Sequence, residues 1–388
     1  MQYQNLSQVN CIMFVDRSTF REDYARIYDR VNESLIAKGV SVLTVIAPGA
    51  TDQERIRFKS YHPVSVEELK KNRQYLTIKH LIGFITQMMK GKIPLSRRRP
   101  WTWSKFYTMF SVIMDFFEQY QPNLVVSMKY DSCYPFVVAA NSLSIPTLAI
   151  QHGDYYCDTD FDYGNDCLRQ VSHEWAASVL LVWNHSVMQF CKSKFGNSHN
   201  YRSIDGPLWH VRYSSRTAVR TDLVIIYESD SSLWSTSLIN SVINYFGIDK
   251  VRIKPHPYLL SKNLSDAALQ FPGLLVSQPL WEVVPKLGIS FSSTVTDELI
   301  FNDCVCVTIT HQKKIGVNFP FTGTFSIDAI GNILVFLEEV YISQSKYQQV
   351  LAAQKGERGE FVSTPLPVAD RIAEICQEYI KSNTQTFR

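Results

Sequence analysis

The sequence lacks the patterns typical of export, membrane insertion and metal binding. Its first residues, MQYQNLSQVN, have no charged start and no apolar core, so we expect no signal peptide. No apolar run reaches the ~18 residues of a membrane-spanning helix. None of the eight cysteines forms a CxxC pair, which favours free thiols in a reducing cytoplasm over zinc or disulfides. We therefore expect a cytoplasmic protein, and peripheral contact with the cytoplasmic face of the inner membrane stays open.

Strong net charge is also missing. The formal charge is +3 and no nucleic-acid-binding motif is present, so nucleic acid is the least favoured partner. Asp158, Asp160 and Asp162 alternate in CDTDFDYGND without the later glutamate of a calcium loop, and we expect a solvated acidic loop and no metal. The basic residues gather in one segment, 70–105.

What is present is a long alternation of apolar, β-rich runs with helix-length segments. With 388 residues and 45% hydrophobic content, the chain has material for two or three domains. Strands that are apolar on both faces and separated by helices predict parallel sheets covered on both sides. We expect two Rossmann-like domains, 1–207 and 223–388, joined by a polar linker at 208–222. Expected helices include 64–92, 106–120, 280–287, 329–341 and 367–382, and 273–277 is expected to be a strand.

Polar residues follow several predicted strands, where ligands of open parallel sheets bind. Lys254-Pro255-His256-Pro257 ends one strand, and Pro257 holds His256 in extended backbone. A rigid imidazole beside a lysine suits phosphate or ribose binding; the alternative is a simple strand-ending turn.

A second group, Ser292, Ser293 and Thr294, lies between a strand and a helix that contains Glu298. Hydroxyls there either cap the helix or bind phosphate together with free N–H groups, and Glu298 suits a ribose hydroxyl.

The third group, Gln151-His152-Gly153-Asp154, follows a strand of the first domain. Gly153 permits a sharp turn, and His152 is a candidate general base with Asp154 orienting it or replacing it. Glu228 is a third candidate base, and Asp16 follows another strand. The alternatives are a polar turn and an ordinary solvated carboxylate.

Taken in order, QHG, KPHP and SST followed by Glu298 resemble the motifs of bacterial surface-polysaccharide glycosyltransferases of the GT-B fold. The likeness is to capsule-synthesis β-Kdo transferases, bacterial sialyltransferases and teichoic-acid glycerophosphotransferases. It implies two Rossmann-like domains facing a central cleft, the first for the acceptor and the second for the donor, with the last helix packing back on the first. In those families the HP histidine and the serine/threonine group hold the cytidine nucleotide, which implies that role for His256, Pro257 and Ser292 to Thr294.

The resemblance implies transfer of Kdo, sialic acid or a related nonulosonate from a CMP-linked nucleotide sugar to an oligosaccharide or lipid-linked glycan acceptor. No cofactor or metal is implied. The chain departs from the sialyltransferases in lacking an acid-acid-glycine base motif. It departs from the glycerophosphotransferases where Asp154-Tyr155-Tyr156 follows HG. A sugar-nucleotide epimerase of the same fold, a CDP-polyol phosphotransferase and a catalytically silent glycan- or membrane-binding module remain as alternatives.

Residues 76–103 combine apolar residues at helical spacing with basic residues and tryptophans. We expect the helical part to pack as core. The loop that follows, with Arg97, Arg98, Arg99, Trp101 and Trp103, is the candidate for contact with a membrane or an anionic acceptor. A solvated loop is the alternative.

Overall fold

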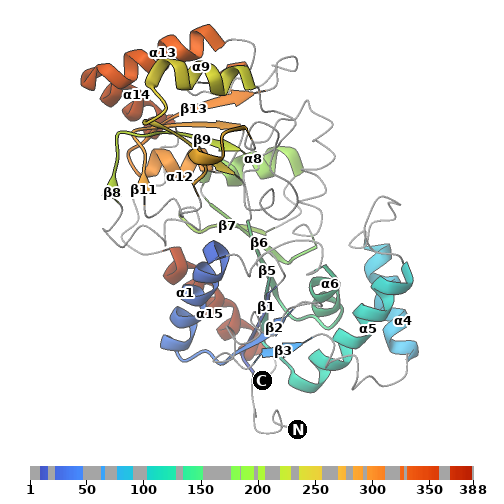
Figure 1. The fold of residues 1–388 in the computed structure, drawn as a ribbon. Coiled ribbons are helices and arrows are strands. Elements are labelled where there is room, and N and C mark those ends of the chain that lie inside the picture. The colour runs from blue at the N-terminus through green and yellow to red at the C-terminus, as the bar shows by residue number, and fades with distance from the viewer. Residues whose placement is uncertain are drawn as a thin grey trace. The chain divides into compact units, whose positions relative to one another are not determined.

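The computed structural model describes most of the chain in seventeen stretches: 9–15, 22–46, 63–65, 77–90, 103–127, 134–151, 176–183, 185–195, 200–205, 219–228, 236–255, 270–276, 283–291, 295–310, 324–326, 330–357 and 368–386. The chain divides into two compact units (Figure 1). Unit 1 comprises Met1–Tyr155, Asn165–Val211 and Glu360–Arg388, and unit 2 comprises Tyr156–Gly164 and Arg212–Gly359. Each unit is described by itself.

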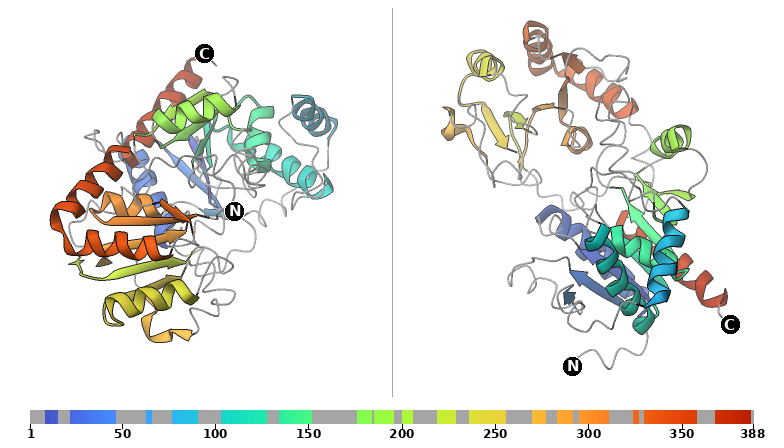
Figure 2. Two further views of the ribbon diagram at one scale, coloured as in Figure 1. Left: turned by 90° about the horizontal axis from the view of Figure 1, so that it is seen from above. Right: turned by 90° about the vertical axis from the view of Figure 1, so that its right-hand side faces the viewer.

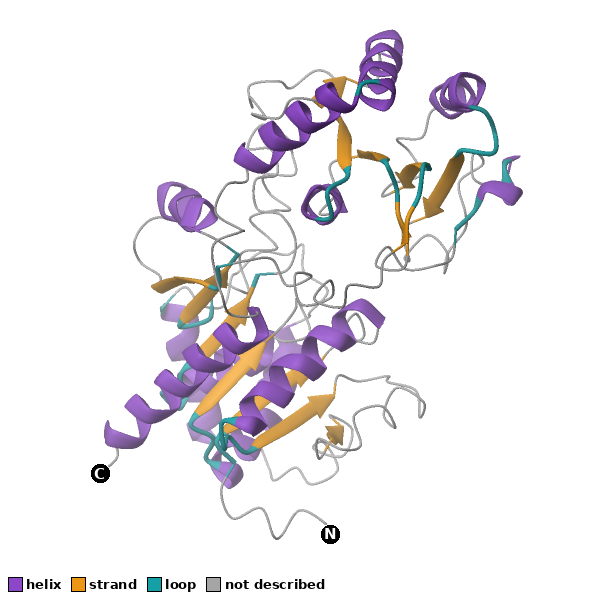
Figure 3. Cartoon of the chain, turned by 90° about the vertical axis from the view of Figure 1, so that its left-hand side faces the viewer, coloured by secondary structure: helices purple, strands orange, loops and turns teal. Residues whose placement is uncertain are grey.

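Unit 1 is built on a seven-stranded parallel sheet in the order β3-β2-β1-β4-β5-β6-β7, and its strands point the same way (Figure 3). The central strands are buried on both faces because they are apolar at almost every position, with Ser127 of β4 and Thr147 of β5 as the polar exceptions. The strands are β1 (Cys11–Val15), β2 (Val42–Ile46), β3 (Pro63–Ser65), β4 (Leu124–Ser127), β5 (Thr147–Ile150), β6 (Val179–Val182) and β7 (Asn200–Ser203).

Helices cover both faces of this sheet. On one side α1 (Glu22–Ala37) lies beside α15 (Val368–Thr386), and on the other lie α5 (Trp103–Tyr120) and α6 (Tyr134–Ser142), with α4 (Ile78–Met89) outside them (Figures 1 and 2). The remaining helix of the unit, α8 (His185–Phe195), follows β6 and contacts β7.

The chain's last helix, α15, belongs to unit 1. It buries an apolar face that includes Ile372, Ala373 and Cys376, each fully inaccessible. Two polar contacts fix it to α1: the Ser34 hydroxyl donates to Asp370 over 2.5 Å, and Gln377 Nε2 donates to the Lys38 carbonyl over 3.2 Å. Residues from the two ends of the sequence thus share one core.

Unit 2 carries a five-stranded parallel sheet in the order β10-β9-β12-β13-β14. Helices α9 and α13 lie on one face, α12 lies on the other, and α14 contacts β13 and both α12 and α13 (Figure 1). The strands are β9 (Val224–Glu228), β10 (Val251–Pro255), β12 (Leu287–Phe291), β13 (Val305–Thr310) and β14 (Thr324–Ser326). The helices are α9 (Thr236–Phe246), α12 (Val295–Phe301), α13 (Ile330–Ile342) and α14 (Gln344–Glu357).

One buried side chain in unit 2 makes the backbone hydrogen bonds that a neighbouring strand would otherwise make. β14 pairs with the last three residues of β13, so among the described residues no strand pairs with the backbone of Cys306 on that side. Gln354 of α14 fills this place: its Nε2 donates to the Cys306 carbonyl over 2.8 Å, and its Oε1 accepts from the Cys306 N–H over 3.2 Å. The side-chain amide therefore satisfies backbone groups that would otherwise be buried and unpaired.

Several predicted elements are wrong. Ser65, predicted to open a helix, ends strand β3; of the predicted helix the structure describes Ile78–Met89, and 66–76 lie outside the described residues. Within the helix predicted at 280–287, Val283–Val284 form strand β11, which pairs with β8 (Val219–Arg220) in the predicted linker. Instead of the strand predicted at 273–277, the 3-10 helix Pro272–Leu274 is followed by an isolated bridge from Leu275 to Ile253. Helix α14 and strand β14 were not predicted.

The expectation that the apolar residues of α4 pack as core is wrong for one face of the helix. His80, Phe84 and Gln87 are buried against α5 and α6, but Ile82 and Met89 are 59% and 84% exposed. Among the described residues, no helix combines the length and apolarity needed to cross a membrane.

Candidate functional site

Three adjacent strands of the unit 2 sheet end at or directly before three of the predicted groups in the sequence. From β9 the chain runs outward to β10 and then returns to the other side of β9 to form β12. The strand order therefore reverses between β9 and β12, and such a switch point is where open α/β sheets bind ligands. Pro255 and Glu228 are register partners at the ends of β10 and β9, and β12 ends at Phe291, one residue before Ser292.

A row of polar residues crosses the sheet just below this edge. Lys254 pairs in register with Tyr227, Tyr227 with Ser290, and Ser290 with Thr308. Tyr227, Ser290 and Thr308 are buried. The residues that precede them on the same strands are apolar. The Ser290 hydroxyl is fully buried and, in the described part of the chain, has no hydrogen-bond partner. An unsatisfied buried hydroxyl costs about 1–3 kcal/mol of stability. The register therefore places a row of polar side chains, one of them unsatisfied, directly above apolar residues of the same strands.

The strand that carries KPHP ends as its sequence predicts. Val251, Ile253 and Pro255 of β10 are buried, while Arg252 and Lys254 alternate with them and are half-buried. β10 is the edge strand of the sheet, so Pro255, which has no N–H, removes no ladder bond needed by a neighbour on its outer side. The backbone at Lys254 is thus fixed by its pairing with β9, and His256 follows one residue after the last paired position.

In unit 1 the corresponding reversal lies between β1 and β4, and β5 follows next to β4. Gln151, directly after β5, is fully buried, and its bonds extend the ladder to β6. Its N–H donates to the Leu181 carbonyl over 2.8 Å, its Oε1 accepts from the Trp183 N–H over 2.8 Å, and its carbonyl accepts from Trp183 Nε1 over 3.3 Å. Gln151 therefore holds the point from which His152-Gly153-Asp154 continue.

The other predicted site residues are described only in part. Glu228 lies at the end of β9, Glu298 within α12 and Trp103 at the start of α5, each placed by its backbone. Outside the described residues lie Asp16, His152, Gly153, Asp154, His256, Pro257, Ser292, Ser293, Thr294, Arg97, Arg98, Arg99 and Trp101. The alternating aspartates at 158, 160 and 162 lie outside them as well.

Buried cysteines are poor candidates for nucleophiles. Burial raises the pKa of Cys11 well above its ordinary value, with a further contribution from Cys376 nearby. Burial likewise raises the pKa of Cys306 and Cys376 to about 12, so these thiols stay protonated near neutral pH. Within the described ranges all five cysteines are free and buried, and no group of three or more His, Cys, Asp or Glu side chains is placed to hold a metal ion.

Sequence reasoning missed the residues that depend on register. Tyr227, Ser290 and Thr308 lie on three different strands, and each reads in the sequence as an ordinary member of a strand. Gln354 reads as one polar residue of a polar helix. The apolar run VLAA directly before this glutamine, as in QQVLAAQ, is the only signal that the sequence offers for its burial.

Comparisons with known proteins establish the fold. No protein-family model matches the sequence, and a search of curated proteins also finds no match. Among solved structures, the UDP-GlcNAc 2-epimerase from Neisseria meningitidis bound to UDP-GlcNAc is similar with a TM-score of 0.58 and 8% identity, over 96% of this chain and 99% of that one. MurG from Acinetobacter baumannii is similar with a TM-score of 0.51 and 12% identity, over 95% and 99%.

A UDP-glucosyltransferase from Polygonum tinctorium is similar with a TM-score of 0.52 and 10% identity, over 96% of this chain and 99% of that one. These likenesses span nearly the whole chain and both parallel-sheet units. The prediction of a GT-B-type fold with two Rossmann-like domains is confirmed.

Proposed function

We propose that this chain is a nucleotide-sugar-dependent glycosyltransferase that acts on a glycan or lipid-linked acceptor. One observation carries the proposal: the adjacent strands β10, β9 and β12 end at the switch point of the unit 2 sheet, at or directly before the candidate groups KPHP, Glu228 and SST. The fold adds support, because similar solved structures include a UDP-glucosyltransferase and a glycosyltransferase of kitacinnamycin.

In the proposed reaction, His152 or Asp154 accepts the proton of an acceptor hydroxyl. The hydroxyl oxygen bonds to the anomeric carbon of the donor sugar as the bond between that carbon and the nucleotide phosphate breaks. The departing phosphate takes the negative charge, and Lys254, His256 and the hydroxyls of Ser292 to Thr294 stabilise it. This chemistry requires no metal or other cofactor.

The donor is, as a finer proposal, a CMP-linked Kdo, sialic acid or related nonulosonate used in surface-polysaccharide synthesis. It is supported by the motif resemblance alone. The names of the similar structures favour uridine instead, since they include UDP-GlcNAc 2-epimerases and a complex of MnaA with UDP. A peripheral position on the cytoplasmic membrane face belongs to the same proposal, and its structural argument rests on α4.

A calorimetric and thermal-shift titration with CMP, CDP, UDP and GDP tests this proposal on the wild type and on His256→Ala. At a nucleotide concentration of about one hundred times Kd, binding stabilises the folded state by about 2.7 kcal/mol. We expect stabilisation by CMP or CDP, its loss in His256→Ala, and its retention in His185→Ala, a matched change at an exposed histidine of α8. A preference for UDP would replace the cytidine donor, and no response to any nucleotide would leave the silent binding module.

An epimerase of the same fold is the second candidate. It is favoured by the four UDP-GlcNAc 2-epimerases among the similar structures, with TM-scores of 0.56 to 0.58. Incubation with UDP-GlcNAc in the absence of an acceptor separates the two candidates. An epimerase would accumulate a new UDP-sugar, which NMR detects. A transferase would leave the nucleotide sugar unchanged until an acceptor is added.

A further inference from the structure

Helix α4 has apolar residues on two opposite faces, and only one face is covered. On the inner face Phe84 packs against the rings of Tyr107 and Phe110, and Gly83 faces Phe110 and Met114 of α5. The outer face is formed by residues that are 44% to 84% exposed: Ile78, Leu81, Ile82, Ile85 and Met89. This set, the α4 stripe, is the densest group of exposed large apolar side chains among the described residues.

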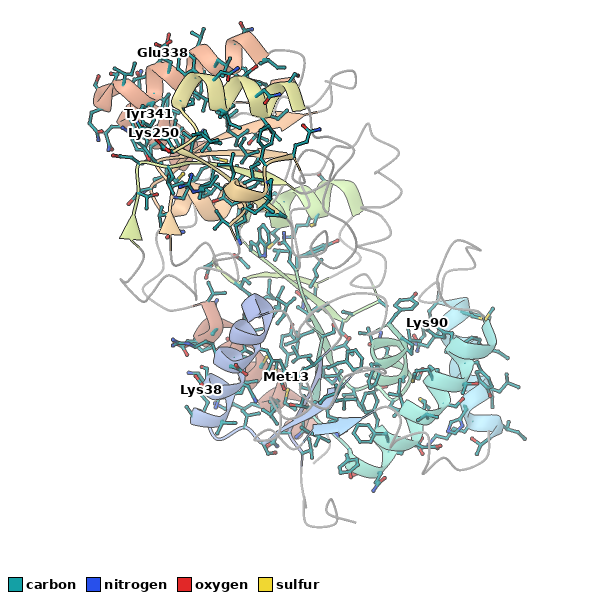
Figure 4. The ribbon with its side chains drawn as sticks, viewed as in Figure 1. Met13, Lys38, Lys90, Lys250, Glu338 and Tyr341 are labelled. Carbon is teal, nitrogen blue, oxygen red and sulfur yellow. The ribbon has the colours of Figure 1, made fainter. Side chains whose placement is uncertain are left out.

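The stripe has the geometry of an interfacial helix. At about 100° per residue its five members fall within about 100° of each other around the helix axis, opposite the inner face. By the same rotation per residue, Lys79 and Lys90 lie near each other around the helix axis, on one flank of the stripe. Lys79 is 62% exposed and reaches Glu118 of α5 over 2.5 Å. Lys90 is exposed at the carboxyl end of the helix (Figure 4).

The positive charge of the chain is concentrated in the stretch of sequence that contains this helix. Residues 69–114 contain ten Lys and Arg residues and no Asp or Glu. Because the formal charge of the whole chain is +3, the rest of the protein carries −7. The stripe is therefore part of the one strongly cationic segment of an otherwise acidic protein.

We propose that the α4 stripe is a docking surface for a membrane that contains anionic lipids. Apolar side chains on one face of a helix, with lysines on its flank, enter the boundary between headgroups and acyl chains. The positive charge of the Lys and Arg residues in 69–114 is attracted to anionic headgroups. A second copy of the chain is the less favourable occupant, because a twofold contact through α4 would bring two cationic segments together.

Vesicle sedimentation of the full chain tests this proposal with phosphatidylcholine alone and with phosphatidylcholine mixed with phosphatidylglycerol. We expect binding to the anionic vesicles that weakens when salt rises from about 0.05 M to about 0.5 M. Ile82→Asn with Ile85→Asn should weaken it about tenfold for each side chain. Lys90→Gln should weaken binding to anionic vesicles about fivefold and leave neutral vesicles unaffected.

The matched control is Val335→Asn with Ile342→Asn, two exposed apolar residues of α13 in unit 2 that are 55% and 74% exposed. Its vesicle binding should equal that of the wild type, and thermal unfolding should show that both double variants fold. The proposal is overturned if the wild type does not bind anionic vesicles, if it binds neutral vesicles equally, or if the control loses binding to the same extent. A dimer that Ile82→Asn with Ile85→Asn dissociates, without vesicle binding, would identify a second copy instead. The inference rests on the membrane-associated position included in the proposed function. Because none of these outcomes depends on nucleotide binding, failure of vesicle binding would overturn that position and leave nucleotide-dependent sugar transfer to its own test.

Discussion

Substitution of Gln151 separates a structural from a chemical role for the first residue of QHGD. Gln151→Leu keeps a side chain of similar size but removes the oxygen that accepts from the Trp183 N–H over 2.8 Å. Trp183 is 1% exposed, so water cannot replace the lost acceptor without opening the core. A buried donor left without a partner costs about 1–3 kcal/mol.

Gln151→Leu should therefore lower the free energy of unfolding of unit 1 by about 1–3 kcal/mol. At about 2–4 °C per kcal/mol, the melting temperature should fall by roughly 2–12 °C. Urea unfolding followed by tryptophan fluorescence measures the free energy, and differential scanning calorimetry measures the melting temperature. Nucleotide affinity should be unchanged, because the proposed donor groups belong to unit 2.

Gln189→Leu is the control, since Gln189 is exposed on α8 and bonds only to the neighbouring His185 among the contacts that the structure shows. Its effect on the free energy of unfolding should stay within about 0.5 kcal/mol. The reasoning is refuted if Gln151→Leu leaves stability unchanged and abolishes transfer activity, because Gln151 would then act on a ligand rather than on the sheet.

Two further predictions concern the core of unit 2 and the buried thiols. Gln354→Leu should lower the free energy of unfolding by about 2–6 kcal/mol, because both the N–H and the carbonyl of Cys306 lose a partner. Urea denaturation measures this free energy, and a decrease below about 1 kcal/mol would contradict the prediction. The pKa of Cys306 and Cys376 is raised to about 12 from 9.0, so unfolded chains lose these protons first as pH rises. Stability should therefore be unaffected by these thiols below pH 9 and fall between pH 9 and about 12. Iodoacetamide at pH 8, followed by mass spectrometry, should label them only after unfolding, and rapid labelling of the native protein would contradict the burial.

The longer strands and most helices were predictable because their signals are local. A run such as VLLV is apolar at every position, which is typical of a strand covered on both faces. The end of α1 was predictable because Gly39 has a φ of 77°, which glycine adopts without strain, and its N–H and that of Val40 close the helix by bonding to Ile36 and Leu35.

The predictions that failed concern elements whose structure depends on contacts with residues distant in the sequence. Val283 and Val284 pair with Val219 and Arg220, more than sixty residues earlier, and a two-residue strand has no period of its own. Helix α14 is polar around most of its circumference, so its burial of Leu351 and Gln354 against α12 and β13 is not visible as an apolar stripe. For α4 the sequence shows that both faces are apolar, but only the structure shows which face α5 and α6 cover.

The candidate site was predictable in position and less so in composition. The carboxyl end of a parallel strand is recognisable from the apolar run that precedes it, and this located Lys254 and Gln151. The sequence predicted both as members of candidate groups, and the structure shows that Gln151 is buried and bonded into the ladder of β5 and β6. The polar row of Tyr227, Ser290 and Thr308 requires the register of three strands, which no local pattern contains.

The QHGD, KPHP and SST groups share one construction. Each contains a candidate ligand residue that directly follows a position whose pairing is observed: His152 after Gln151, His256 after Pro255 and Ser292 after Phe291. Rigid pairing up to the last strand residue lets the next side chain be placed at low entropic cost, since only one further residue must be fixed. Changes at the paired positions should therefore act on stability, and through it on every property of the protein. Changes one residue later should act on ligand affinity while the sheet stays intact, and this contrast between neighbouring residues is what a ligand site built on strand ends requires.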